Sequence, residues 1–242
     1  MKNNSKIPLP WIAFIFFMAA WSGSEPVYSC ETVPSSFHAV LEKRAGDSAQ
    51  VLIVSSNRPE SFTARTYAFE KKNGSWRLVL TPAPSVIGAK GFAPPGMKKE
   101  GDGKTPSGIF PLGAAFGYEK SVATQMPYRQ AAQDDVWVDD ARSGDYNRWV
   151  KKGETKAASF ERMLRDDNLY KYGVVIEYNT NPVISGRGSA IFFHVWKSGE
   201  EPTSGCVAMS ESDILKILRW LNPAAKPLVI MGTVQTIMEI GR

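Results

Sequence analysis

The chain has 242 residues, of which 43% are hydrophobic and 22% are charged, and its formal net charge is +5. These values are typical of a globular protein of one large domain or two small ones, and they exclude a disordered chain. The mild positive charge suits an anionic polymer as partner, but the sequence has no long basic run and no nucleic-acid-binding motif, which argues against a nucleic-acid-binding protein.

The N-terminal segment has the pattern of a signal peptide. Lys2 and Lys6 precede an apolar run over residues 11–21, which is shorter than the roughly 20 residues that span a membrane comfortably. We therefore expect residues 1–30 to be a signal peptide, with an uncleaved N-terminal anchor as the alternative. The protein is then exported, to the periplasm or the cell-wall side of the membrane. Residues 31–242 form a single domain with its core at about 48–233.

The two cysteines, Cys30 and Cys206, leave three possibilities open. In an exported protein they could form a disulfide, and Cys206 would then be structural. Cys30 follows a segment with a faint likeness to a lipoprotein cleavage box, so its lipidation is a second possibility. Alternatively, Cys206 is a free thiol.

The first part of the domain reads as an antiparallel meander. Asn73-Gly74 is a strong hairpin sequence between two segments rich in β-formers, and Pro82 and Pro84 are expected to break the third strand. A mixed segment over residues 37–45 precedes the meander and contains His38, which is interpreted as a surface or packing residue. Strands are predicted at residues 50–55, 62–70, 76–80 and 85–88.

The segment 88–113 is rich in Gly, Pro and Lys and contains Thr105-Pro106-Ser107-Gly108-Ile109-Phe110. We interpret this run as a turn that leads into a core strand beside a cleft.

Residues 114–172 are less regular. An acidic segment at 134–140 surrounds Trp137, but the calcium-loop consensus is absent, so neither a metal site nor any other cofactor is expected. Tyr146 and Trp149 follow, and we expect this insertion to wall a cleft and to present both aromatic rings to a glycan or peptide. The spacing of Phe160, Met163 and Leu164 predicts a helix over residues 157–169.

Residues 190–210 hold the candidate catalytic pair. A predicted strand leads into His194, and after a polar loop Cys206 is expected just before a helix N-terminus. An imidazole is the usual base for a thiol nucleophile, and the helix dipole would favour the thiolate. From the residues alone two other readings stay open: Cys206 as a small buried hydrophobe and His194 as a satisfied strand residue.

The C-terminal part predicts one amphipathic helix and one closing strand. Ser210 and Asp213 resemble a capping box, the helix continues to Leu221, and Asn222-Pro223 ends it. The strand is predicted at residues 227–232.

The segment around Cys206 resembles the catalytic motif of the L,D-transpeptidase (YkuD-like) family of cell-wall enzymes. The matching residues are His194, Thr203, Gly205, Cys206 and Val207. The departures are Ser204 in place of a His, Val195 in place of a small residue and Ala208 in place of Arg or Asn, and we interpret them as features of a divergent branch. The segment 105–110 is similar to the family's second motif, and the resemblance covers roughly residues 48–233.

The resemblance implies a mostly β fold with a few helices, a sandwich or barrel-like catalytic domain. It implies that Cys206 attacks an amide carbonyl of a peptidoglycan stem peptide while His194 is the base, held by a backbone carbonyl near Val195. Main-chain amides around Gly205 and Cys206 are expected to form the oxyanion hole, and Ser204 could add a hydroxyl.

The candidate substrate-binding residues are Arg187, Tyr146, Trp149 and Thr203. Of these, Arg187 could hold a substrate carboxylate.

Three functions therefore remain possible besides transfer to an amine. With water as acceptor the enzyme is an L,D-carboxypeptidase. A disulfide at Cys206 would make it a non-catalytic wall-binding scaffold, and an ordinary cysteine peptidase would cleave all-L peptides. The acceptor amine belongs to a neighbouring stem or to a wall-attached protein, and the enzyme is expected to act as a monomer.

Overall fold

The computed structural model describes residues 33–241. The predicted signal peptide, the alternative anchor and Cys30 lie outside this range. No helix within it is long and apolar enough to cross a membrane.

The main sheet of the described residues has nine strands in the order β11-β12-β13-β3-β2-β1-β14-β6-β7. An additional pairing of β11 with β6 closes the sheet on itself, so the fold is mostly β and barrel-like, as predicted. The strands are β1 (Gln50–Ser56), β2 (Thr63–Lys72), β3 (Ser75–Val86), β6 (Gly108–Gly117), β7 (Tyr128–Gln130), β11 (Tyr172–Ile176), β12 (Phe192–Val195), β13 (Val207–Met209) and β14 (Leu228–Thr233).

The meander of β1, β2 and β3 confirms the prediction in outline. Asn73 and Gly74 have φ angles of 51° and 79°, as a two-residue hairpin requires. The expected break at the prolines was wrong, because β3 continues through Pro82 and Pro84. On its other side β3 pairs with β13 only at Val86, so the two prolines lie on a strand edge that donates no ladder hydrogen bonds there.

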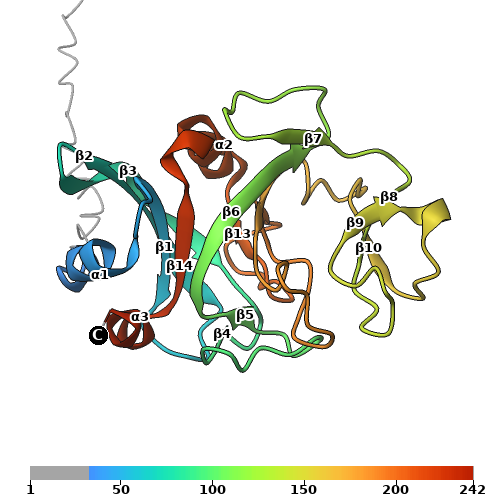
Figure 1. The fold of residues 1–242 in the computed structure, drawn as a ribbon, viewed down its shortest axis with the longest axis horizontal. Helices are drawn as coiled ribbons and strands as arrows, with labels where there is room; N and C mark the ends of the chain where they lie inside the picture. The colour runs from blue at the N-terminus through green and yellow to red at the C-terminus, as the bar shows by residue number, and fades with distance from the viewer. Residues whose placement is uncertain (1–32, 242) are drawn as a thin grey trace, which may run out of the picture. The chain divides into compact units, whose positions relative to one another are not determined.

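Three α-helices lie within the described residues: α1 (Ser36–Arg44), α2 (Glu211–Trp220) and α3 (Val234–Ile240). Short 3₁₀ turns follow Lys151 and Asn222 as η1 (Lys152–Glu154) and η2 (Pro223–Ala225). The predicted cap of α2 is confirmed, because Ser210 accepts the amide of Asp213. The segment 37–45, left without an element by the sequence, is α1, and it lies near α3 beside β1 and β14 (Figure 1).

The core strand predicted after Thr105 is confirmed, whereas Thr105 and Pro106 themselves form a short strand and not a turn. Thr105–Pro106 forms β5, which pairs in parallel with β4 (Phe92–Ala93), and β6 begins at Gly108. This part of the chain therefore leads directly into a strand of the closed sheet.

A separate three-stranded sheet occupies much of the irregular middle of the chain (Figure 1, yellow). Its strands are β8 (Asp135–Val138), β9 (Trp149–Lys151) and β10 (Phe160–Arg162). The helix predicted over 157–169 was wrong: Phe160 pairs with Val138 across an antiparallel ladder. The helical pattern consists of only three apolar residues, and among them only Met163 is fully buried. The pairing with β8 therefore decides the local structure.

The small sheet packs on the strand that carries His194. The rings of Trp137 on β8 and Phe192 on β12 have centroids 4.9 Å apart in an edge-to-face contact. Phe116 of β6 contacts Phe192 in the same way, at 5.3 Å. This apolar cluster, which also contains Cys206, joins the insertion to the main sheet beside the candidate active site.

Candidate active site

His194 is fixed by backbone pairing on both sides. β12 pairs antiparallel with β11, where His194 lies opposite Gly173, and parallel with β13, where it lies opposite Ala208. The imidazole is buried, with 5% of the residue exposed. The strand predicted to carry this histidine is confirmed.

The ring of His194 is held in one tautomer. Nδ1 lies 2.8 Å from the carbonyl oxygen of Val195, as expected from the sequence. Because a carbonyl only accepts hydrogen bonds, Nδ1 carries the proton and Nε2 keeps its lone pair. Burial lowers the pKa of His194 to about 4, and the bond to Val195 only partly opposes this. The imidazole is therefore neutral, and able to accept a proton, at physiological pH.

Cys206 is followed by β13, not by a helix. The sequence placed it at a helix N-terminus, but α2 begins only at Glu211, after the whole of β13. No helix dipole therefore favours the thiolate. Burial, with the negative charge of Glu161 as a second cause, raises the pKa of the Cys206 thiol well above its usual range.

The thiol makes two contacts with the strand that precedes the loop. Sγ donates to the carbonyl of Ala190 at 3.1 Å and accepts the amide of Phe192 at 3.4 Å. Cys206 is a free cysteine and 7% exposed. In the resting protein both Cys206 and His194 are thus neutral.

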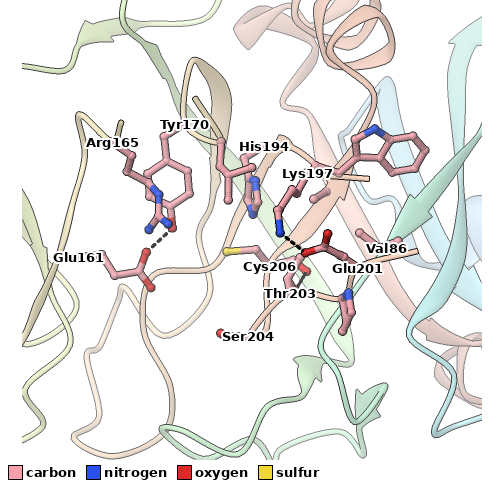
Figure 2. Close-up of a pocket in the computed structure, with 14 residues that line it drawn as sticks. Val86, Glu161, Arg165, Tyr170, His194, Lys197, Glu201, Thr203, Ser204 and Cys206 are labelled. Carbon is pink, nitrogen blue, oxygen red and sulfur yellow. Dashed lines mark hydrogen bonds and ion pairs between the residues drawn. The ribbon is translucent and has the colours of Figure 1, made fainter. Parts of the chain in front are cut away.

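The parallel pairing of β12 with β13 brings the two residues together. Phe193 lies opposite Val207, so Cys206 stands one residue before the ladder, next to the strand that holds His194. Both side chains reach the same pocket, where Figure 2 shows the sulfur below the imidazole ring. No hydrogen bond between them is formed in the described part of the chain. This is common in substrate-free sites, where catalytic hydrogen bonds are often long.

Two threonines hold the loop that ends at Cys206. Thr203 Oγ1 donates to the carbonyl of Cys206 at 2.7 Å and accepts the amide of Gly205 at 3.1 Å. Thr105 Oγ1 donates to the carbonyl of Gly205 at 2.8 Å. The segments 105–110 and 203–206, about 100 residues apart in sequence, therefore form one hydrogen-bonded unit.

Gly205 allows a close approach of two backbone segments. A Cβ at this position would lie 3.0 Å from the carbonyl oxygen of Lys104 and 3.3 Å from Ile191. Its amide, which the sequence assigned to the oxyanion hole, is donated to Thr203 Oγ1. In this geometry an oxyanion would have to be bound by the neighbouring amides of the loop, starting with that of Cys206.

The pocket has a volume of about 190 Å³ and two charged walls. One wall contains Glu161, Arg165 and Tyr170, and the other contains Lys197 and Glu201, with Cys206 and His194 between them (Figure 2). Lys197 and Glu201 form an exposed ion pair at 2.8 Å. The rest of the lining consists of Val86, Leu169, Trp196, Pro202, Thr203, Ser204 and Ala208.

The wall formed by Glu161, Arg165 and Tyr170 is organised around the tyrosine ring. Tyr170 donates its hydroxyl to Glu161 Oε2, and the guanidinium of Arg165 lies 5.0 Å from the ring centroid. The ring also packs edge-to-face against His194, with centroids 5.2 Å apart. All three residues were missed from the sequence. Glu161 and Arg165 lie in residues 157–169, which were interpreted as a helix, and Tyr170 follows directly.

Two of the predicted supporting residues lie in or near the pocket, and one does not. Thr203 lines it, although its side-chain oxygen holds the loop. Ser204 lines it as an exposed residue, and Figure 2 shows its side chain lying away from His194. Arg187 does not line the pocket, and its Nη1 donates to the carbonyl of Gly96 at 2.6 Å.

The two predicted aromatic binding residues do not line the pocket either. Tyr146 is 2% exposed, donates to Glu100 Oε2 at 2.5 Å and accepts the amide of Gly188 at 3.0 Å. Trp149 is covered by the guanidinium of Arg129, 4.2 Å from its ring centroid. In this structure both residues serve the packing of the insertion.

Within residues 33–241 no group of three or more His, Cys, Asp or Glu side chains is placed to hold a metal ion.

A family model described as the L,D-transpeptidase catalytic domain (YkuD) matches residues 52–232. No curated protein matches the chain. Two solved structures are similar, the helical cell shape determining protein Pgp2 from Campylobacter jejuni and a point mutant of it, each 16% identical to this chain. The TM-scores are 0.39 and 0.37, over 82% and 86% of this chain. The matches span only 55% and 62% of those two chains.

Proposed function

The chain belongs to the YkuD family of L,D-transpeptidase catalytic domains, and we propose that it is a cysteine-dependent acyltransferase acting on peptidoglycan stem peptides. The observation that carries the proposal is the placement of Cys206 and His194 in one pocket. The parallel strands β12 and β13 hold them there, and the bond from Nδ1 to Val195 leaves the lone pair of the imidazole on Nε2.

The reaction begins with a neutral thiol and a neutral imidazole. As the sulfur of Cys206 bonds to the carbonyl carbon of the donor, its proton passes to Nε2 of His194, and the carbonyl electrons move to oxygen. When the tetrahedral intermediate collapses, the C–N bond breaks and the leaving amine takes the proton from Nε2. A thioester remains on Cys206.

The second half of the reaction reverses these roles. An acceptor amine attacks the thioester carbonyl and gives a proton to Nε2, and the thiol is released with that proton. We assign the developing oxyanion to loop amides beginning with that of Cys206, because Thr203 occupies the amide of Gly205. Thr105 and Thr203 keep this loop in place during both halves.

By family, the donor is a tetrapeptide stem that loses its terminal D-Ala, and the acceptor is an amine of a second stem or of a wall-attached protein. This activity requires export, which we assign to residues 1–30 as a signal peptide or anchor. With water as acceptor, the same thioester would make the protein an L,D-carboxypeptidase.

Incubation of the purified protein with disaccharide tetrapeptides, followed by mass spectrometry, tests the proposal. We expect a cross-linked dimer with wild type and none with Cys206→Ala. Loss of one alanine without a dimer would assign the carboxypeptidase reaction instead. If wild type forms neither product and its Cys206 thiol is oxidised, the proposal is wrong and the scaffold reading is favoured. Cleavage restricted to all-L peptides would indicate an ordinary peptidase.

A further inference from the structure

The charged wall beside Cys206 carries a cationic group that the reaction chemistry described above does not use. Arg165 and Lys197 are the cationic side chains that line the pocket within the described part of the chain. Lys197 is 69% exposed and paired with Glu201, whereas Arg165 is 32% exposed and held on two sides. Arg165 is therefore the more ordered and the less hydrated of the two charges.

The guanidinium of Arg165 is preorganised. Asp167 accepts Nε at 2.9 Å and Nη2 at 2.5 Å, and the ring of Tyr170 lies against the guanidinium face. Nη1 takes no part in this ion pair. A guanidinium fixed in this way loses little conformational entropy when it binds an additional anion, and Nη1 with the second hydrogen of Nη2 can donate to a carboxylate.

Arg165 lines the same pocket as Cys206 and His194. Its positive charge contributes to lowering the pKa of both His194 and Cys206, so it lies within electrostatic range of both. Glu161, the nearby acid, accepts the Tyr170 hydroxyl, and burial raises its pKa.

Resting on the proposed function, we propose that Arg165 binds the terminal carboxylate of the acyl donor, so that the enzyme removes only the last residue of a stem. One residue of extended chain spans about 3.3–3.6 Å. Arg165 and Cys206 line one pocket of about 190 Å³, so we assign the bound carboxylate to the residue that follows the attacked carbonyl. A donor with further residues, or with an uncharged end, would leave Arg165 without its anion.

The test compares a disaccharide tetrapeptide with its C-terminal carboxamide, using wild type, Arg165→Gln, Arg165→Lys and Lys197→Gln. We expect wild type to prefer the acid in kcat/KM by about 10- to 100-fold, the range for a hydrogen bond to a charged group. Arg165→Gln should abolish the preference by lowering the rate on the acid, mainly through KM. Arg165→Lys should retain part of it, because it keeps the charge without the fork.

The controls separate recognition from folding. Lys197→Gln removes the other cation of the pocket and should leave the preference unchanged. All variants should unfold in one cooperative thermal transition, and all should retain one Cys206 thiol that can be alkylated. Equal rates of wild type on acid and amide would overturn the inference, as would an Arg165→Gln variant that loses both substrates equally. If wild type acts on neither substrate, the proposed function fails and the subsite fails with it.

Discussion

His194 and Cys206 are carried by strands whose neighbours are fixed by backbone pairing, whereas Glu161, Arg165 and Tyr170 are carried by a three-residue strand and turns. The first region belongs to the closed sheet, and the second belongs to the insertion between β6 and β11. The two regions therefore have different proposed roles. We propose that the regular sheet positions the two groups that exchange a proton and that the irregular insertion supplies the charge that binds the substrate.

Removal of the thiol is the strongest test of the role proposed for the sheet. Cys206→Ala should reduce acyl transfer about 10⁴-fold or more, as loss of a catalytic nucleophile does elsewhere. The unfolding transition should change little, because alanine fits the site of a small buried side chain. Residual activity close to wild type in the muropeptide assay would show that the sheet does not carry the nucleophile.

The next largest effect is expected at the base. His194→Gln removes Nε2 as a proton acceptor and should lower kcat/KM by about 10²–10⁴-fold. His38→Gln is the matched control, because His38 lies on α1 with its ring against Phe69. Equal losses in the two variants would contradict a specific role for His194.

The pH dependence of kcat/KM tests the role of His194 without a substitution. The pKa of His194 is about 4, so kcat/KM should hold through mildly acidic pH and fall only as the pH approaches 4. A histidine with an ordinary pKa of about 6.5 would already lose about tenfold at pH 5.5. An acid limb with its midpoint near 6.5 would show that the imidazole is not buried as described.

Burial of a neutral histidine also affects stability. The unfolded chain binds a proton at His194 near pH 6.5, whereas the folded protein does so only near pH 4. The stability that depends on a neutral His194 is therefore fully present above about pH 6.5, and it is lost as the pH falls toward 4. The shape of the activity profile should be corrected for unfolding measured at each pH.

A smaller effect is expected from the support of the loop. Thr105→Val removes the hydrogen bond to the carbonyl of Gly205 and should lower activity about tenfold, as a modest misplacement of the nucleophile would. Thr66→Val is the control, because it breaks a buried hydrogen bond to Ser85 elsewhere in the sheet. Each variant should lose about 1 kcal/mol in the free energy of unfolding. If both lose the same activity per folded molecule, Thr105 has no special part in placing Cys206.

The smallest effect on activity is expected at Tyr146. Tyr146→Phe removes the hydrogen bond to Glu100 and should lower the free energy of unfolding by about 1–3 kcal/mol while kcat/KM stays close to wild type. The measurement is chemical unfolding combined with steady-state kinetics. A large rise in KM at unchanged stability would instead restore Tyr146 as a binding residue.

The sheet was predictable where short-range rules agree with the fold. Asn73-Gly74 marked the hairpin, and Ser210 marked the start of α2, because both patterns act through nearby backbone groups. The strand ending at His194 was readable from its apolar run. Even here Cys206 was misplaced, since the three residues of β13 between the loop and α2 are too short to show a period.

The insertion could not be predicted, because residues distant in sequence override its local pattern. Phe160 and Met163 have helical spacing, yet their surroundings are decided by β8 and by the cluster around Phe192, which are distant in sequence. Arg165 acquires its position from Asp167 and Tyr170 together, and only the folded chain brings Arg165 and Tyr170 to the pocket. Arg187, the arginine chosen from the sequence, has no such partners there.

The measurement that tests the central claim most directly is the intact mass of the protein mixed with a disaccharide tetrapeptide and quenched in acid. We expect a disaccharide tripeptide bound to wild type as a thioester, released by hydroxylamine and absent from Cys206→Ala. Product formed without any adduct on Cys206, or an adduct that persists in Cys206→Ala, would contradict it.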